Sequence, residues 1–467
     1  MSDKVSYRRD SISAFRRRFS FLVASLVLAS STVSIAQVKT KNDLGMAQFD
    51  TDEVTQYEEL KSESKIALSR KSVSELLKVA QDYSPGLREA ASGEDAAKAE
   101  VSAAKGEKLP KVTVTGQTTY TDGDMASRAR ATGKPSMVIT AEYPVYDWGR
   151  IDANIRGREF ALTTENARKR LVSNQLAIDA LSACIELNKQ VKILKANEDY
   201  NAKIRRLADL LAKITEQDSG RAGEFIQTRS RLLQGESAAE TIRSRVKELR
   251  IRLVKLLGEN RDGLCENIGP SLMQLPSADK LVNAVDVHPE VIFFNEQYGQ
   301  AKTNIDQLAA LQKPQVRLQA QHAPMAPGVS NLYAQSLNLL ATIPLYDGNT
   351  LKSSQLAAIS RADAAVERIQ LVKDRLKSEL QERAQQTKTN LERAEAYIVL
   401  LQINERVIND FYIQWATLGR RTLFELLALQ AEQLNLKVGY FSTLHDGMNG
   451  VAYLETQLGM IPDNLPK

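Results

Sequence analysis

Tyr143-Pro144-Val145-Tyr146-Asp147-Trp148-Gly149 returns 200 residues later as Ile343-Pro344-Leu345-Tyr346-Asp347-Gly348. Each copy follows a short run in which apolar and polar residues alternate, and each precedes a long run without proline. Alternation is typical of a strand, and a long proline-free run with apolar residues every three or four positions is typical of a helix. Both copies therefore predict a turn from a strand into a long helix, centred on the sets Pro144, Asp147, Gly149 and Pro344, Asp347, Gly348.

Two other landmarks repeat in the same order. Pro85 returns as Pro289, 204 residues later, and Gly220 returns as Gly419, 199 residues later. Self-similarity at a nearly constant spacing indicates a duplicated architecture. We expect a first repeat over 72–272, with a hairpin tip near Gly220, and a second over 273–467, with a tip near Gly419.

Each half has the same predicted order of a helix, two strands, a very long helix and a returning helix. In the first half, these elements are expected at 75–108, 111–120, 136–146, 150–217 and 222–257. In the second half, they are expected at 279–312, 315–322, 334–345, 350–416 and 421–457.

The long helices are the unusual feature of the chain. Between Arg150 and Gln217 there is no proline, and Gly157 is the only glycine. At 1.5 Å per residue this is roughly 100 Å of helix. Apolar residues such as Leu207 and Leu211 recur at a 3/4 spacing, which predicts coiled-coil packing against neighbouring helices. Charged residues fill most other positions, so we expect a helical layer one helix thick.

The predicted strands have one apolar and one polar face. Val112, Val114, Gly116, Thr118 and Tyr120 fall on one side of the first strand, and Leu337, Leu339, Ala341 and Ile343 on one side of the fourth. Strands of this length suit a bilayer when they are tilted. The apolar face would meet lipid and the polar face a wet lumen. A soluble sandwich with one buried face is the alternative, but four strands cannot close a lipid-facing barrel alone, so several chains would share one barrel.

Composition and motifs argue against an enzyme and against nucleic-acid binding. The net charge is only +5 over 467 residues, with 43% hydrophobic and 25% charged residues. His288, His322 and His445 lie far apart and show no metal-ligand spacing, so no metal and no cofactor are expected. No glycine-rich phosphate loop or nucleophile elbow is present.

The first residues are typical of an export signal. Arg8, Arg9 and Arg16 to Arg18 form a basic region before a short apolar run, and Ser34-Ile35-Ala36 fits a cleavage site. We predict a signal peptide at 1–36, with a membrane-anchor helix as the alternative, followed by a flexible polar segment at 37–71. No later stretch approaches 18 apolar residues, the length a membrane helix needs.

With the repeat, the strand pairs and the long helices in place, the chain resembles the TolC family of outer-membrane export channels from about 72 to 458. The Pro-x-Tyr-Asp-x-Gly motif is similar to the family's strand-to-helix turn, and Gly419 to Leu427 is similar to its second periplasmic tip. The resemblance implies a homotrimer with a twelve-stranded barrel in the outer-membrane lipid and a twelve-helix tunnel in the periplasm. It also implies two partners, a periplasmic adaptor (membrane fusion) protein and an inner-membrane ABC or proton-driven pump.

The resemblance also assigns residues to the periplasmic mouth, which the two glycine turns would form. Arg421 falls on the family's gating arginine and Glu425 on its first acidic-ring position, whereas Ala428 occupies the second acidic position. An ordinary solvated i,i+4 pair is the alternative for Arg421 and Glu425. The neighbouring charges that complete the candidate tip are Arg221, Glu224 and Arg420; Arg229 is a further charge there, and these would contact the adaptor or simply be solvated.

The two cysteines suggest a disulfide. Cys184 lies 36 residues before Gly220, and Cys265 follows a returning helix of similar length, so the two should reach nearly the same height on the helical layer. The periplasm is oxidising. We expect a Cys184–Cys265 bond that clips the loop at 258–277, with two independent thiols as the alternative.

The expected function is the exit duct of a tripartite export system. Residues 220–234 resemble type I secretion channels slightly more, which favours protein secretion, and small-molecule or drug efflux is the alternative. A periplasmic, adaptor-like coiled-coil protein is the least favoured interpretation, because adaptors lack lipid-facing strands and a full duplication.

Overall fold

The computed structural model describes residues 70–117, 136–259, 262–266, 275–323, 334–417 and 419–459. The expected signal peptide at 1–36 and nearly all of the segment at 37–71 lie outside these residues. The first half contains α2 (Arg70–Tyr83), α3 (Pro85–Gly106), β1 (Lys111–Gln117), β2 (Ser136–Tyr146), α4 (Arg150–Thr215), the short 3₁₀ helix η2 (Ser219–Arg221), α5 (Ala222–Leu257) and α6 (Asp262–Glu266). The second half contains α7 (Ala278–Ala284), α8 (Pro289–Leu311), β3 (Gln315–Ala323), β4 (Ala334–Thr342), α9 (Thr350–Ala416) and α10 (Leu423–Gln457).

The expected order of elements is present in both halves, and the fold class is confirmed as long helices with a four-stranded antiparallel sheet. The 66 residues of α4 and the 67 residues of α9 each extend roughly 100 Å at helical rise. None of the helices in the described part of the chain is both long and apolar enough to cross a bilayer.

One expectation about the first helix of each half is wrong. Single helices were expected at 75–108 and 279–312, but each is broken before its proline. Ser84 and His288 are extended, with ψ of 115° and 136°, because a residue before proline avoids the helical region. Each instead caps the helix that follows, through a side-chain bond to the backbone N–H of Leu87 and Glu290 respectively.

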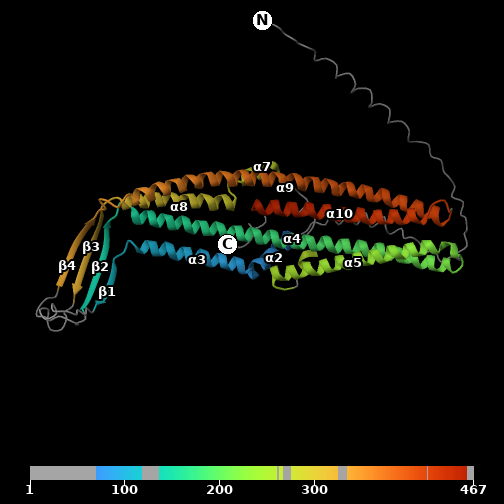
Figure 1. Ribbon diagram of the computed structural model, residues 1–467, viewed down its shortest axis with the longest axis horizontal. Coiled ribbons are helices and arrows are strands. Elements are labelled where there is room, and N and C mark those ends of the chain that lie inside the picture. Colours follow the sequence, from blue (N-terminus) through green and yellow to red (C-terminus); the bar gives the residue numbers. More distant parts are fainter. Residues whose placement is uncertain are drawn as a thin grey trace, which may run out of the picture. The chain divides into compact units, whose positions relative to one another are not determined.

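The helices form a layer in which α4 is the central element (Figure 1). Towards the sheet, α4 packs between α3 and α8, and α8 packs on α9. Towards the hairpin tips, α4 packs between α5 and α10, and α10 packs on α9. The two halves of the chain are therefore joined along α4–α8 and α4–α10, and apolar clusters fill the α4–α10 seam.

Close helix contacts depend on glycines that face a neighbouring side chain. A Cβ at Gly450 of α10 would lie 2.0 Å from the hydroxyl oxygen of Thr387 on α9. A Cβ at Gly235 of α5 would lie 2.0 Å from Oδ1 of Asn201 on α4. Because neither contact leaves room for a methyl group, these positions allow the paired helices to approach closely.

The sheet has the strand order β1-β2-β3-β4, with all neighbours antiparallel. The central β2–β3 pair joins the two halves, with a register shift between Pro144 and Tyr146. β4 ends at Thr342, three residues before the expected end at 345, and β1 is described to Gln117, so Thr118 and Tyr120 lie outside the described residues. The two outer strands, β1 and β4, each have one edge that no described strand of this chain pairs.

Candidate functional site

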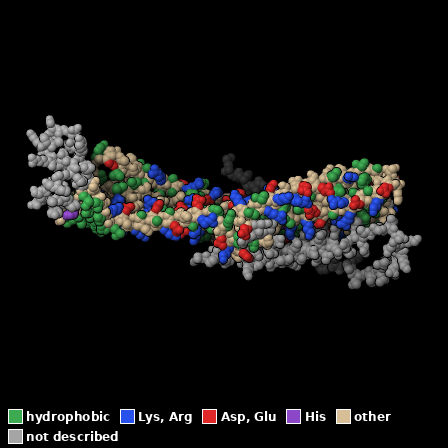
Figure 2. All heavy atoms as spheres, turned by 90° about the horizontal axis from the view of Figure 1, so that it is seen from below, with side chains coloured by type: hydrophobic (Ala, Val, Ile, Leu, Met, Phe, Trp, Pro, Cys, Tyr) green, Lys and Arg blue, Asp and Glu red, His purple; other side chains and the backbone are tan. Residues whose placement is uncertain are grey.

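One face of the sheet is mainly apolar across all four strands, with His322 and Gln335 as polar exceptions. The register places Val112 beside Ala141, Ala141 beside Ala320, and Ala320 beside Leu337. The next row towards the helices contains Tyr143 beside Leu318 and Leu318 beside Leu339. Val112, Leu337 and Leu339 are 66%, 71% and 68% exposed, so nothing in the described part of the chain covers this face. Figure 2 shows hydrophobic side chains gathered over this end of the molecule, whereas charges of both signs alternate along the helices.

The opposite face of the sheet is polar. One row across it consists of Lys111, Glu142, Gln319 and Asn338. Gln319 donates its side-chain N–H to Oε1 of Glu142 at 2.8 Å, which pairs the two halves through polar groups. Val138 and Leu340 interrupt the pattern, so the face is mainly, not entirely, polar. A sheet with these two faces suits an apolar medium on one side and water on the other.

The turns from strand to helix are built alike in both halves. Asp147 accepts the backbone N–H of Ile151 at 2.7 Å, and Asp347 accepts that of Leu351 at 2.7 Å. Two consecutive residues with positive φ follow each aspartate, as a type I′ turn requires. In the second half these are Gly348 and Asn349, which tolerate the conformation; in the first half they are Trp148 and Gly149.

The far ends of the long helices form two turns of different design. Gly419 has a φ of 58°, so this turn depends on the conformational freedom of glycine. Gly220, at the expected tip of the first hairpin, does not have positive φ. Asp218 organises that turn instead, because its Oδ1 accepts the N–H of Gly220 at 3.0 Å within η2.

Arg421 lies between the end of α9 and the start of α10. Its guanidinium donates to Oε1 of Gln414 and to Oε1 of Glu425, each at 3.3 Å. It also lies 4.4 Å from the ring centroid of Phe411. The side chains of Arg421 and Glu425 are 41% and 40% exposed, so the pair itself is a weak surface interaction in a single chain. Gln414 and Phe411 are partners of Arg421 that the sequence did not reveal.

Glu425 has a second role in the capping box of α10. Thr422 accepts the N–H of Glu425, and Oε2 of Glu425 accepts the backbone N–H of Thr422 at 2.9 Å. This backbone bond, with smaller contributions from the Thr422 hydroxyl and from Arg421, lowers the pKa of Glu425. The pattern Thr-x-x-Glu before an apolar run signals a capping box, so Thr422 could have been found from the sequence.

The remaining candidate charges of the two tips are distributed over η2, α5 and the turn before α10. Glu224 is half-buried in the first turn of α5, and its Oε2 has no hydrogen-bond partner among the described residues. Arg221 lies in η2, and the backbone N–H of Arg420 donates to the Gln414 carbonyl at 3.2 Å. Arg229 lines a shallow open groove on α5 with Ile226 and Leu233. The structure therefore does not gather these charges into one cluster.

An apolar cluster connects the two hairpins at their tips. It contains residues of three helices, namely Ile204, Leu207 and Leu211 of α4, Trp415 of α9, and Leu423, Leu426 and Leu427 of α10. Both turns thus rest on one shared core, and a movement of either hairpin there must repack the other.

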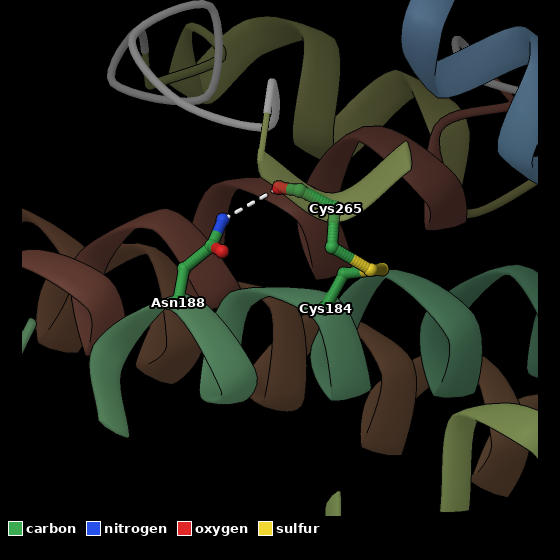
Figure 3. The surroundings of a disulfide bond; sticks show 3 residues. All are labelled: Cys184, Asn188 and Cys265. Carbon is green, nitrogen blue, oxygen red and sulfur yellow. Dashed lines mark hydrogen bonds between the residues drawn. A yellow bond between two sulfur atoms is a disulfide. The ribbon is translucent and has the colours of Figure 1, made fainter. Parts of the chain in front are cut away.

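Cys184 and Cys265 form a disulfide in the structure, with their Cα atoms 5.0 Å apart (Figure 3). The bond attaches α6, in the connection between the two halves, to α4. Asn188, one turn further along α4, donates its side-chain N–H to the carbonyl of Cys265 at 2.6 Å. Among the described residues, no group of three or more His, Cys, Asp or Glu side chains is placed to hold a metal.

Comparisons with known proteins agree with this geometry. Residues 76–259 match the family model of the outer membrane efflux protein. The fold matches the solved structures of CusC (TM-score 0.72, 14% identity, 83% of this chain and 92% of that chain) and of the outer membrane protein VceC from Vibrio cholerae (0.71, 16%, 83% and 96%). It also matches the Campylobacter jejuni CmeC outer membrane channel (0.70, 12%, 83% and 86%). A search of curated protein sequences finds no significant match.

Proposed function

We propose that this chain is a member of the outer membrane efflux protein family, whose model residues 76–259 match, and that three copies form a continuous duct across the outer membrane and the periplasm. The observation that carries the proposal is the sheet, which has an uncovered apolar face, a polar face and two unpaired outer edges. A lipid-facing sheet must have no open edge, because backbone groups in hydrocarbon need partners. Pairing β4 of one copy with β1 of the next supplies those partners, and three copies make twelve strands.

The helical layers of the three copies would enclose the periplasmic part of the duct. Its mouth would lie at the turns near Gly220 and Gly419, roughly 100 Å from the strand-to-helix turns. Three-fold symmetry would bring three copies of Arg421 and Glu425 together, so that the weak pair of one chain becomes part of a ring. Arg221, Glu224 and Arg420 would form the rim available to a periplasmic adaptor.

The cargo would arrive from an inner-membrane ABC or proton-driven pump, which supplies the energy. The sequence of residues 220–234 favours type I protein secretion as the process that the duct serves. The description of the matching family model, an efflux protein, supports small-molecule efflux as the second candidate. Deleting the gene and comparing secreted or surface protein with drug sensitivity separates the two, because loss of one phenotype with the other intact identifies the cargo class.

A matched pair of substitutions tests the duct itself. Leu339 lies on the apolar face of β4, and Asn338 lies beside it on the polar face. Leu339→Lys puts a charge into hydrocarbon, at a cost of roughly 2–4 kcal/mol at mid-bilayer depth. We expect it to abolish the detergent-resistant trimer in outer-membrane fractions, whereas Asn338→Lys should preserve it. A water-soluble monomer that binds no detergent, or equal effects of the two substitutions, would refute the proposal.

A further inference from the structure

An aromatic–cationic cluster lies at the end of the apolar face nearest the helices. Tyr146 is paired with Val316, so its ring belongs to the apolar side of the sheet. The ring of Trp148 meets that of Tyr146 edge-on, with centroids 4.9 Å apart. Nζ of Lys313 lies 5.0 Å from the centroid of the Trp148 ring. Tyr146 and Trp148 are 54% and 45% exposed, so the cluster is open to the surroundings of the sheet.

Trp148 is held in place by its own backbone conformation in the first half of the chain and by a backbone carbonyl of the second half. It adopts a φ of 56°, which a bulky residue rarely does, and its indole N–H donates to the carbonyl of Pro314 at 2.8 Å. Since the indole N–H is already used, the exposed part of the ring offers only its apolar surface and the cation held above it.

Among the described residues, Lys313 has no carboxylate partner, unlike two cations on the helices nearby. Lys108 is paired with Asp152, and Arg156 with Asp306. Within the described residues, Lys313 makes no ion pair, and its only charge-related contact is with the Trp148 ring. An ammonium group on an aromatic face retains N–H donors for a further acceptor.

We propose that Tyr146, Trp148 and Lys313 form a site for the phosphate of an anionic phospholipid in the leaflet on the helix side of the sheet. Aromatic rings of this kind lie at the level of lipid headgroups, and the apolar face beside them suits the acyl chains. Lys313 supplies the positive charge that pairs with the phosphate. An anionic headgroup binds more tightly than a zwitterionic one, because it carries no cation of its own that competes with Lys313 for the phosphate. This inference rests on the proposed function, since it requires the sheet to lie in a bilayer.

Only one half of the chain contains the site. By the spacing of the repeat, the position of Lys313 corresponds to Leu109, and that of Trp148 to Gly348. Neither a cation nor an aromatic ring is present there, so each chain carries one lipid site, at the junction of its two halves.

The chain has two tryptophans, Trp148 and Trp415, so Trp415→Phe leaves Trp148 as the single emitter. This parent would be reconstituted as the full mature chain in vesicles of mixed phosphatidylglycerol and phosphatidylcholine. In separate samples, one or the other lipid would be brominated near the carbonyl end of its acyl chains. Quenching of Trp148 then reports which lipid lies next to it. We expect a preference of about fivefold for phosphatidylglycerol, the factor that corresponds to about 1 kcal/mol for one lysine at an anionic surface.

Three further variants in the parent background separate local from diffuse charge effects. Lys313→Gln should reduce the ratio to about one, and Lys313→Arg should retain the preference, because guanidinium also stacks on indole. Lys302→Gln removes the same charge from an exposed position on α8, about 16 Å further along the helix, and should also retain it. Equal quenching by both lipids in the parent, or an equal loss in Lys302→Gln and Lys313→Gln, would overturn the lipid site while leaving the channel intact. Absence of quenching by either lipid, with release of the protein by alkaline carbonate, would instead count against the proposed function.

Discussion

At the scale of single residues, Glu425 combines a charge with a structural hydrogen bond, and two substitutions separate them. Glu425→Gln can keep the capping box, because an amide also accepts the Thr422 N–H, whereas Glu425→Ala cannot. We expect Glu425→Ala to lower the urea midpoint of unfolding and Glu425→Gln to lower it by less than half as much. Urea unfolding at neutral pH measures both.

The same carboxylate contributes to pH dependence in a defined direction. Its pKa lies below the usual 4.5, so its stabilisation is present above that value and is lost as the pH falls through the lowered pKa. Glu425→Gln should therefore flatten the acid limb of the stability curve. An unchanged acid limb would mean that the capping bond does not depend on ionisation.

His445 gives a pH effect in the same direction but at higher pH and for a different reason. Its side chain is 3% exposed, and its Nδ1 lies 2.7 Å from the Phe441 carbonyl oxygen. Burial, together with the positive charges of nearby Lys192 and Lys189, lowers the pKa of His445 to about 4, while the Glu186 carboxylate acts in the opposite direction. The unfolded chain gains a proton near pH 6.5 but the folded chain only near pH 4, so stability falls across this window as the pH is lowered. We expect His445→Gln to remove on the order of 3 kcal/mol of this dependence, measured by denaturant unfolding from pH 4 to 7. Parallel pH curves for the two proteins would contradict the assignment.

At the scale of elements, helix pairing depends on which glycines face a neighbour. A Cβ at Gly450 would meet Thr387 at 2.0 Å, whereas a Cβ at Gly106, at the end of α3, would meet nothing within 4 Å. Gly450→Ala should destabilise the chain by about 1–3 kcal/mol through overpacking of α10 on α9. Gly106→Ala should be neutral or stabilising by up to about 1 kcal/mol, because alanine is the better helix former. Thermal unfolding of both variants tests the pairing, and a neutral Gly450→Ala would show that α10 can move away from α9.

Periodicity predicted the elements because the long helices and the strands each satisfy a local pattern. The 3/4 spacing around Leu207 and Leu211 correctly indicated buried positions of α4, which are 7% and 0% exposed. The breaks at Ser84 and His288 were missed because the apolar spacing continues across them. A proline in the first turn was the available signal, since the residue before it cannot remain helical.

At the scale of the whole molecule, the Cys184–Cys265 bond ties the connection between the halves to α4. The two residues are 81 positions apart, so the bond closes a loop that contains the second half of α4, the tip at Gly220 and all of α5. In the chain-entropy description, a loop of this length stabilises the folded chain by about 4 kcal/mol. Cys184→Ser with Cys265→Ser should lower the unfolding midpoint accordingly, whereas Lys195→Ala, at an exposed position of α4, should have little effect. Two free thiols titrated in the unreduced native protein would show that the bond does not form.

The candidate site contains two kinds of contact, those within a few residues of the chain and those between distant elements. Asp147, Asp347 and Thr422 act on backbone groups within four residues, so their roles are visible in the sequence. The contacts of Arg421 with Phe411 and Gln414, and of Trp148 with Pro314, cross between elements. Spacing alone does not specify which side chains meet at such junctions.

The sequence by itself determined the order of elements, the two-faced strands and the strand-to-helix turns, because each follows from interactions among residues close together in the chain. Only the tertiary structure decided that α4 packs between the halves, that β2 pairs with β3, and that Lys313 lies over Trp148. The physical reason is that these contacts join segments far apart along the chain, as many as 267 positions for Asn449 of α10 and Ser182 of α4. Their geometry depends on how closely whole helices and strands approach, which no local pattern of residues encodes.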